Sequence, residues 1–188
     1  STVKPFIFAQ AFEAGRASPD DVFDDKKLSF KLEGGRRWEP ANYGNKYFGK
    51  ITLREALAKS LNSVAIQLLQ KADIDGVIKL LSEATGQPAA RFPRNLSLAL
   101  GTGDLAPVAV ARAYAALANG GMTVEPYFVE SIEDRNGAVL RPGGPPAPPL
   151  RVLSKGVSST MRGLMTGVFL PGGTAHAAAA GIGIFLTF

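Results

Sequence analysis

STVKPFIF (residues 1–8) opens the chain, and SLN (residues 60–62) is the second stretch around which we interpret it. Ser1 and Lys4 are three residues apart, so a helix would place the hydroxyl and the amine on one face. A serine nucleophile needs a base within hydrogen-bond reach, and a lysine is such a base only when burial or a nearby cation lowers its pKa. The apolar residues after Lys4 would provide that burial. Alone, the S-x-x-K spacing also fits a solvated helix start.

Composition indicates a globular chain of one domain, or one domain and a part. With 188 residues, 46% of them hydrophobic and 20% charged, the chain can bury a sizeable core. It has no cysteine, which excludes disulfides, thiolate zinc sites and cysteine nucleophiles. The net charge of +5 comes from 21 basic and 16 acidic side chains that are scattered along the sequence. Because the basic residues do not alternate with aromatic residues, no nucleic-acid partner is indicated.

Apolar residues at helical spacing predict a helix-rich chain. The first helix covers residues 3–14 and ends at Gly15, a residue type that favours helix ends. The second begins at Thr52 and Glu55, which form a capping box, and runs toward Ser60. Further periodic segments cover residues 63–72, 73–84, 107–118 and 154–170.

Residues 16–50 lack this periodicity and collect turn-forming residues, with a short strand predicted at residues 28–32. A loop of this length in a compact domain is usually functional or disordered. Aromatic side chains favour ordered packing here, and the segment carries Trp38, Tyr43, Tyr47 and Phe48. We therefore expect a long, ordered surface excursion.

The last third of the chain predicts one hairpin and little other β structure. The sequence DRNG at residues 134–137 lies between two β-prone segments, at residues 127–133 and 138–140. Residues 142–149 read as a Pro/Gly-rich connector, and residues 181–186 have the composition of a buried strand. With no βαβ alternation, the pattern predicts an α+β, helix-rich fold.

The first eight residues resemble the active-site helix of penicillin-binding proteins, in which a serine nucleophile and a lysine are spaced S-x-x-K. The second signature of that superfamily, S-x-N, is present at residues 60–62 within TLREALAKSLNSVAIQLL (residues 52–69), which resembles the class A, bifunctional branch. Other similar segments are YGN at 43–45, LGTGD at 100–104, AY at 113–114, GG at 120–121 and GTA at 173–175. The resemblance runs in order over residues 1–176. It implies the helical lobe and part of the sheet of a β-lactamase-like transpeptidase fold.

The resemblance also implies roles for four residues in a D,D-transpeptidase of peptidoglycan synthesis. Ser1 would attack the carbonyl of a D-Ala-D-Ala stem peptide, or of a β-lactam, and become acylated. Lys4 would be the general base, and Ser60 would relay a proton to the leaving amine. Asn62 would hold the substrate amide and position Lys4. The amine of a neighbouring stem peptide, or water, would then release the acyl group, with no cofactor and no metal.

One family motif is missing from the sequence. K-T-G should follow GTA at 173–175 closely, on the strand that supplies a cation for the substrate carboxylate and one oxyanion N–H. Here His176 leads instead into AAAA (residues 177–180) and GIGIFLTF (residues 181–188). We therefore expect residues 1–176 to be a partial transpeptidase domain without the later strands, and residues 177–188 to be an atypical apolar tail. The parent protein would be membrane-anchored, carry a glycosyltransferase domain and face the periplasm from the bacterial cytoplasmic membrane.

Two other interpretations stay open. The chain could be an inactive fragment that serves as a scaffold or interaction surface, which the missing K-T-G favours. An N-terminal serine could also use its own α-amine as base, as in N-terminal nucleophile hydrolases, but those folds need layered sheets. His176 is the only histidine, so a metal site is not predicted. The segment GTGD at 101–104 superficially resembles a phosphate loop, but no lysine follows it, and we reject nucleotide binding.

Overall fold

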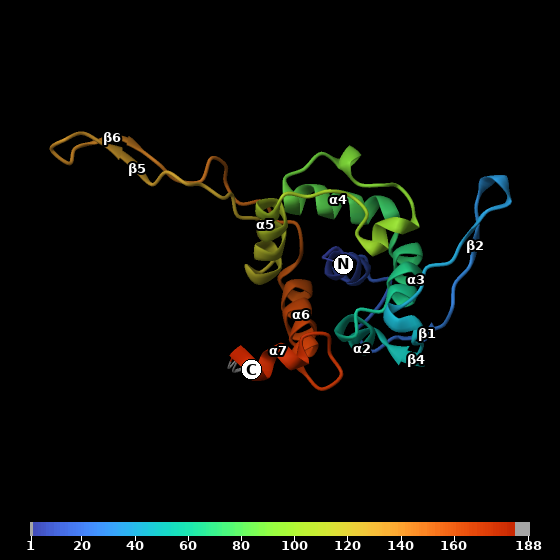
Figure 1. Cartoon of the computed structure of the whole chain (residues 1–188). Coiled ribbons are helices and arrows are strands. Elements are labelled where there is room, and N and C mark those ends of the chain that lie inside the picture. The colour runs from blue at the N-terminus through green and yellow to red at the C-terminus, as the bar shows by residue number, and fades with distance from the viewer. Residues whose placement is uncertain (1, 183–188) are drawn as a thin grey trace.

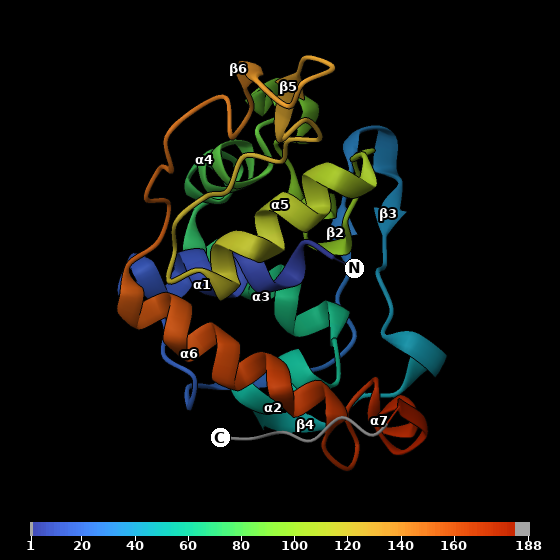
Figure 2. The ribbon, with the colours of Figure 1, turned by 90° about the vertical axis from the view of Figure 1, so that its left-hand side faces the viewer.

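A computed structural model describes residues 2–182, and its helices pack around a central helix, α1 (Lys4–Glu13). In Figures 1 and 2 the other helices surround α1 on several sides. The helices that make the most extensive contacts with it are α3 (Asn62–Ala72), α4 (Ile74–Thr85) and α6 (Lys155–Thr166). Outside them, α5 (Pro107–Ala118) packs on α4 and α6, and α2 (Leu53–Ala58) packs on α6.

The central position of α1 follows from its sequence. Seven of its ten residues are buried, and they lie on all sides of the helix. A helix that is apolar all round can only be stable inside a core. Pro5 lies in the first turn, where its missing N–H is tolerated, and Gly15 has a φ of 63°, a left-handed conformation that suits the residue after a helix end. The predicted helix is confirmed.

The other predicted helices are present, with ends set by recognisable caps. Thr52 and Glu55 form the expected capping box of α2, and α4 ends at the left-handed Gly86. Ser154 caps α6, and its backbone N–H and hydroxyl both donate to Glu13 at 3.0 and 2.9 Å. The prediction for residues 154–170 was too long, because α6 ends at Thr166 and a 3-10 turn follows. Three 3-10 turns complete this part of the chain: Ala89–Arg91, Leu96–Leu100 and Gly167–Phe169.

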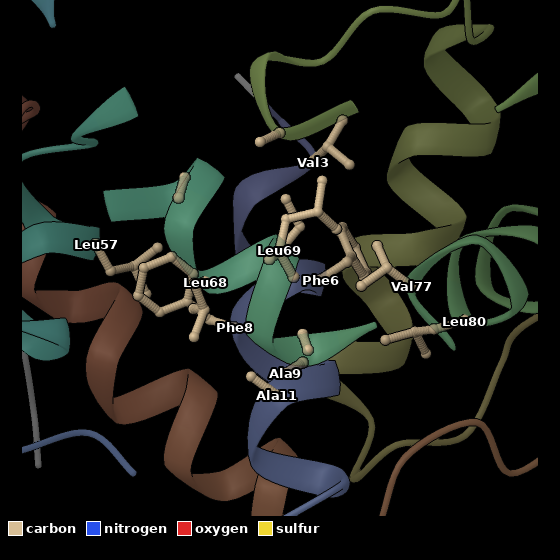
Figure 3. Close-up of a cluster of buried hydrophobic side chains, with 14 of the residues drawn as sticks. Val3, Phe6, Phe8, Ala9, Ala11, Leu57, Leu68, Leu69, Val77 and Leu80 are labelled. Atoms are coloured by element: carbon tan, nitrogen blue, oxygen red, sulfur yellow. The ribbon is translucent and has the colours of Figure 1, made fainter. Parts of the chain in front are cut away.

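The hydrophobic core is built by α1 and the helices that enclose it. Figure 3 shows the side chains of Phe8, Leu57 and Leu68 together on one side of α1, and those of Phe6 and Val77 on the other. All five are at most 6% exposed. The helical layer therefore forms a continuous core of its own within the part of the chain that the structure describes.

Beta structure between residues 2 and 182 consists of three antiparallel two-stranded ribbons and one isolated antiparallel bridge, Met122 with Arg151. The strand pairs are β1 (Val22–Asp25) with β4 (Gly49–Thr52), β2 (Phe30–Lys31) with β3 (Arg37–Trp38), and β5 (Ser131–Glu133) with β6 (Val139–Pro142). The strand predicted at residues 28–32 is the shorter β2. The predictions missed β1 and β4, which lie far apart in the sequence and close the base of the excursion at residues 16–50.

The excursion is ordered, but its aromatic side chains do not all pack. Trp38 stacks on Phe30, with 5.3 Å between ring centroids, and the ammonium of Lys59 lies 5.1 Å from the Phe48 ring centroid. Tyr43 is fully exposed, in a 3-10 turn (Tyr43–Asn45), so the expectation that it packs was wrong. A second 3-10 turn, Glu33–Gly35, forms the tip of the β2–β3 ribbon.

The predicted hairpin is confirmed, and in Figure 1 it projects from the helical body on the side opposite to the excursion. The strand expected at residues 181–186 is not confirmed: residues 181 and 182 belong to a final helix, α7 (His176–Ile182), and residues 183–186 lie outside the described residues. No helix within residues 2–182 is both long enough and apolar enough to cross a membrane.

We predict that truncation of a core side chain strongly destabilises the protein. Leu68 is fully buried beside Phe8, so Leu68→Ala should lower the free energy of unfolding by about 2–5 kcal/mol, through lost burial and the cavity left behind. Leu140→Ala is the matched control, because Leu140 is 68% exposed on the hairpin and should change stability by less than about 0.5 kcal/mol. Urea unfolding followed by circular dichroism measures both. Equal effects would contradict the assigned core.

Candidate active site

Lys4 is the centre of the candidate site. It is the first residue of α1 and only 3% exposed. Its ammonium donates to three acceptors: the carbonyl oxygen of Ser60 at 2.5 Å, Ser60 Oγ at 2.9 Å and Asn62 Oδ1 at 2.7 Å. An ammonium group has three N–H donors, so these contacts match its full donor capacity. Ser60 and Asn62 thus both contact the Lys4 nitrogen, although they lie 56 and 58 positions after it in the sequence.

Ser60 lies in the break between α2 and α3. Its φ is 54°, which places it among the few non-glycine residues of the described chain with a left-handed backbone. The Ser60 N–H bonds the Leu57 carbonyl, and the next N–H, of Leu61, bonds the Ala56 carbonyl at 3.0 Å. This tight turn directs both the hydroxyl and the carbonyl of Ser60 toward Lys4. The sequence interpretation of a helix break that also carries function is consistent with this geometry.

Asn62 is the first residue of α3, and both ends of its side chain are engaged. Its Oδ1 accepts from Lys4, and its Nδ2 donates to the Ala41 carbonyl at 2.7 Å. The carboxamide therefore links α1, α3 and the excursion. Lys4, Ser60 and Asn62, which were selected from the sequence, are brought together in one cluster.

Ser1 lies outside the described residues, but the chain next to it is held in place. The hydroxyl of Tyr114 on α5 donates to the Thr2 carbonyl at 3.0 Å. The Tyr114 ring contacts Phe6 edge to face, with 5.5 Å between centroids. This contact anchors the segment immediately before Lys4 to a helix more than a hundred residues away. In the sequence, Tyr114 was noted only within the segment AY at 113–114, and that segment gave no signal for the contact of its hydroxyl.

A groove of about 500 Å³ opens beside Lys4 and Ser60. Most of its wall is apolar, and α6 and the 3-10 turn after it supply one side. The lining residues are Thr2, Lys4, Pro5, Leu57, Ser60, Tyr114, Met165, Val168, Phe169 and Thr174. A small molecule or peptide end in this groove would lie against the amine and the hydroxyl.

Burial lowers the pKa of Lys4 from 10.5 to about 8. Removing the amine from water disfavours its charged form, which is the effect anticipated from the apolar residues after Lys4. Burial also raises the pKa of the Tyr114 hydroxyl, so that hydroxyl stays protonated and can keep donating to Thr2. A neutral Lys4 amine can accept a proton at a pH well below that of an ordinary lysine.

Two polar residues beside the site were missed in the sequence. Asp25, on β1, and Asn42 are 1% and 5% exposed, and both lie in the excursion that precedes the S-x-N turn. Nothing in the local pattern of residues 22–25 distinguishes Asp25 from an exposed carboxylate, because its partners come from three separate segments.

His176 is exposed, with Nδ1 3.0 Å from the Phe169 carbonyl. Among the described residues there is no cluster of His, Asp and Glu suited to a metal ion.

We predict a pH-dependent stability that is specific to Lys4. Its pKa is about 8 when folded and 10.5 when unfolded, so between these values the unfolded chain binds more protons and stability rises with pH. The contribution is fully present above pH 10.5 and is lost as the pH falls through 8. Relative to Lys4→Met, the free energy of unfolding should therefore increase from pH 7.5 to 10.5 in urea titrations. A difference that stays constant over this range would contradict the lowered pKa.

Comparison with known proteins places this geometry in a family. A family model described as the penicillin-binding protein transpeptidase domain matches residues 1–184. Penicillin-binding protein 1A of Pseudomonas aeruginosa is 39% identical over 150 residues, which are 80% of this chain and 18% of that protein. The Escherichia coli protein of the same name is 34% identical over 140 residues, covering 74% and 16% of the two chains. The chain thus spans less than a fifth of the length of these relatives.

Solved structures agree. The crystal structure of penicillin-binding protein 1A from Haemophilus influenzae matches with a TM-score of 0.82 and 30% identity, over 90% of this chain and 29% of that one. The imipenem acyl-enzyme complex of penicillin-binding protein A from Mycobacterium tuberculosis matches with a TM-score of 0.72 and 26% identity, over 89% and 42%. The family anticipated from the S-x-x-K and S-x-N motifs is confirmed: this chain belongs to the penicillin-binding protein transpeptidase domain family, and its similarity is to the proteins named 1A.

Proposed function

We propose that the chain carries the acylating centre of a D,D-transpeptidase that cross-links peptidoglycan stem peptides ending in D-Ala-D-Ala. Three contacts of one buried amine carry this proposal: Lys4 Nζ lies within 2.9 Å of Ser60 Oγ, the Ser60 carbonyl and Asn62 Oδ1. A desolvated lysine amine is the kind of base that activation of a serine nucleophile requires, and the hydroxyl of Ser60 beside it is suited to proton transfer. Membership of the transpeptidase family supports the same chemistry.

The proposed reaction begins with attack of the Ser1 hydroxyl oxygen on the carbonyl carbon of the terminal D-Ala-D-Ala bond. The hydroxyl proton passes to the neutral amine of Lys4. Ser60, 2.9 Å from that amine, then gives a proton to the leaving D-alanine nitrogen and regains one from Lys4. The C–N bond breaks, and the stem peptide remains as an ester on Ser1. The amine of a second stem peptide, or water, attacks that ester and frees the serine.

Asn62 has two proposed tasks. Its Oδ1 holds the Lys4 ammonium after proton uptake, and its second amide N–H would bind the amide of the substrate backbone. A β-lactam would enter as a substrate mimic. Its ring amide opens on attack, and the nitrogen that leaves stays tethered to the acyl group, so the whole drug remains on Ser1. Penicillin-binding protein A from Mycobacterium tuberculosis, which is similar to this chain, was solved as an imipenem acyl-enzyme and is a precedent in another protein.

The setting of the parent protein is part of the proposal. Since the chain spans under a fifth of relatives named penicillin-binding protein 1A, we propose that it derives from a bifunctional protein with a membrane anchor and a glycosyltransferase domain. That protein would work on the periplasmic face of the bacterial cytoplasmic membrane. We further propose that residues 1–176 are the transpeptidase part of this chain and residues 177–188 an atypical tail.

A second candidate function is an inactive scaffold. The absence of K-T-G from the sequence favours it, since the site would lack the cation and the oxyanion donor of that strand. An N-terminal nucleophile hydrolase finds no support, because residues 2–182 hold three two-stranded ribbons and no layered sheets. The two remaining candidates differ in one measurable property, which is whether the chain accepts an acyl group.

We predict that incubation with benzylpenicillin adds the full mass of the drug to the intact chain, as read by mass spectrometry. Ser1→Ala should abolish the adduct, because it removes the proposed nucleophile. Ser97→Ala is a matched control: it removes a hydroxyl that bonds Thr102 on the surface, and it should leave the adduct unchanged. Folded protein that never forms an adduct would support the scaffold instead.

We also predict that the acylation rate rises with pH and levels off above about pH 8. The neutral form of Lys4 is the proposed base, and its pKa is about 8, so the rate constant should fall about tenfold for each pH unit below that value. Stopped reactions analysed by mass spectrometry between pH 5.5 and 9.5 would give the profile, with circular dichroism confirming the fold at each pH. A flat profile would contradict the role of Lys4 as base.

A further inference from the structure

The turn that presents Ser60 needs support from outside itself. A left-handed backbone conformation is unfavourable for a non-glycine residue such as Ser60. It persists only where contacts with the surrounding structure hold it in place. Leu61, the residue that precedes α3, has an apolar side chain and offers no cap to the helix. The first N–H groups of α3 therefore need an acceptor from elsewhere in the chain.

Asn42 supplies that acceptor from twenty residues upstream. Its Oδ1 accepts from the N–H of Asn62 at 2.8 Å and from the N–H of Ser63 at 3.1 Å. The carbonyl of the adjacent Ala41 accepts from Asn62 Nδ2 at 2.7 Å. Residues 41 and 42 therefore fix both the backbone and the side chain of Asn62, whose Oδ1 faces Lys4.

Asp25 determines how the Asn42 carboxamide is oriented. Asn42 Nδ2 donates to Asp25 Oδ1 at 2.7 Å and to the Lys46 carbonyl at 3.0 Å. With two acceptors on one side and two N–H donors on the other, one orientation of the amide satisfies all four contacts. Asp25 is held in turn by the Phe48 N–H at 2.9 Å and by the Ser63 hydroxyl.

We propose that Asp25 and Asn42 are positioning residues of the active site, acting through Asn62 and the Ser60 turn on Lys4. The functional meaning of this inference rests on the proposed acylation chemistry. The chain of hydrogen bonds from Asp25 through Asn42 to Asn62, which we call the Asp25–Asn42 relay, is given by the contacts themselves. Asp25 also places a buried carboxylate near the N-terminus of α3, where the helix dipole favours negative charge. Asp25 lies in β1 and Asn42 lies in the segment before β4, so both ends of the excursion at residues 16–50 support the site.

The direct test is Asn42→Ala, read in two ways. Hydrogen exchange by NMR should show that the Asn62 side-chain N–H₂ and the backbone N–H groups of residues 62 and 63 lose at least tenfold in protection. Benzylpenicillin acylation should slow by at least tenfold. Asn95→Ala is the matched control, since Asn95 Oδ1 accepts from the Ser97 N–H at 2.9 Å at an exposed position, and both readings should stay within twofold of the parent chain.

An exchange of the two side chains separates a specific hydrogen bond from general damage. Asn42→Asp places two carboxylates face to face and should lose protection and acylation. Adding Asp25→Asn restores a donor and an acceptor between the two positions, but not the donor to the Lys46 carbonyl, and should recover part of both. This pair also decides the matter if Asn42→Ala does not fold. Equal behaviour of the single and double variants, or unchanged Asn62 protection in Asn42→Ala, would overturn the inference.

The exchange reading keeps the two proposals distinguishable. If the parent chain is not acylated by penicillin, the proposed function fails. The protection of Asn62 from hydrogen exchange still tests the Asp25–Asn42 relay. If the parent chain is acylated but Asn42→Ala is acylated equally fast with normal Asn62 protection, the relay fails and the proposed function stands.

Discussion

Burial of the Lys4 amine is the constraint that organises this molecule. An amine that is 3% exposed needs acceptors for every proton it carries, and it obtains them from one short turn. That requirement ties the start of α1 to the break between α2 and α3. The apolar faces of α1 then determine how α3, α4 and α6 can surround it. The cluster of Lys4, Ser60 and Asn62 and the hydrophobic core therefore both depend on the same helix packing.

The polar groups around this centre form a closed set. No buried side-chain nitrogen or oxygen in the described part of the chain lacks a hydrogen-bond partner. This includes Asp25, Asn42 and Ser63, which are enclosed by the ribbon of β1 and β4 and by α3. In a low-dielectric interior such a network is rigid when complete and costly when one member is lost. Rigidity is what a base, a relay hydroxyl and an amide need in order to keep their relative positions.

Local signals in the sequence were sufficient for the helices. Capping residues and apolar spacing predicted α1 to α6 to within a few residues, and the S-x-x-K and S-x-N spacings selected Lys4, Ser60 and Asn62, which meet in space. Several of the failures share one cause. β1 and β4, the buried Asp25 and the Tyr114 contact with Thr2 all depend on partners distant in sequence. The expectation that Tyr43 packs was wrong for a different reason. An aromatic composition favours packing, but the ring is buried only where another surface of the protein faces it.

The left-handed backbone of Ser60 places stability and chemistry in competition. Glycine or asparagine adopts that conformation more easily, and a serine there costs roughly 1–2 kcal/mol. Under the proposed chemistry, proton transfer through the Ser60 hydroxyl would offset this cost. A lineage of such domains released from catalysis would be expected to drift toward glycine at this turn while its core helices stayed unchanged. The identity of a single turn residue would thus record whether a descendant is still under selection as an enzyme.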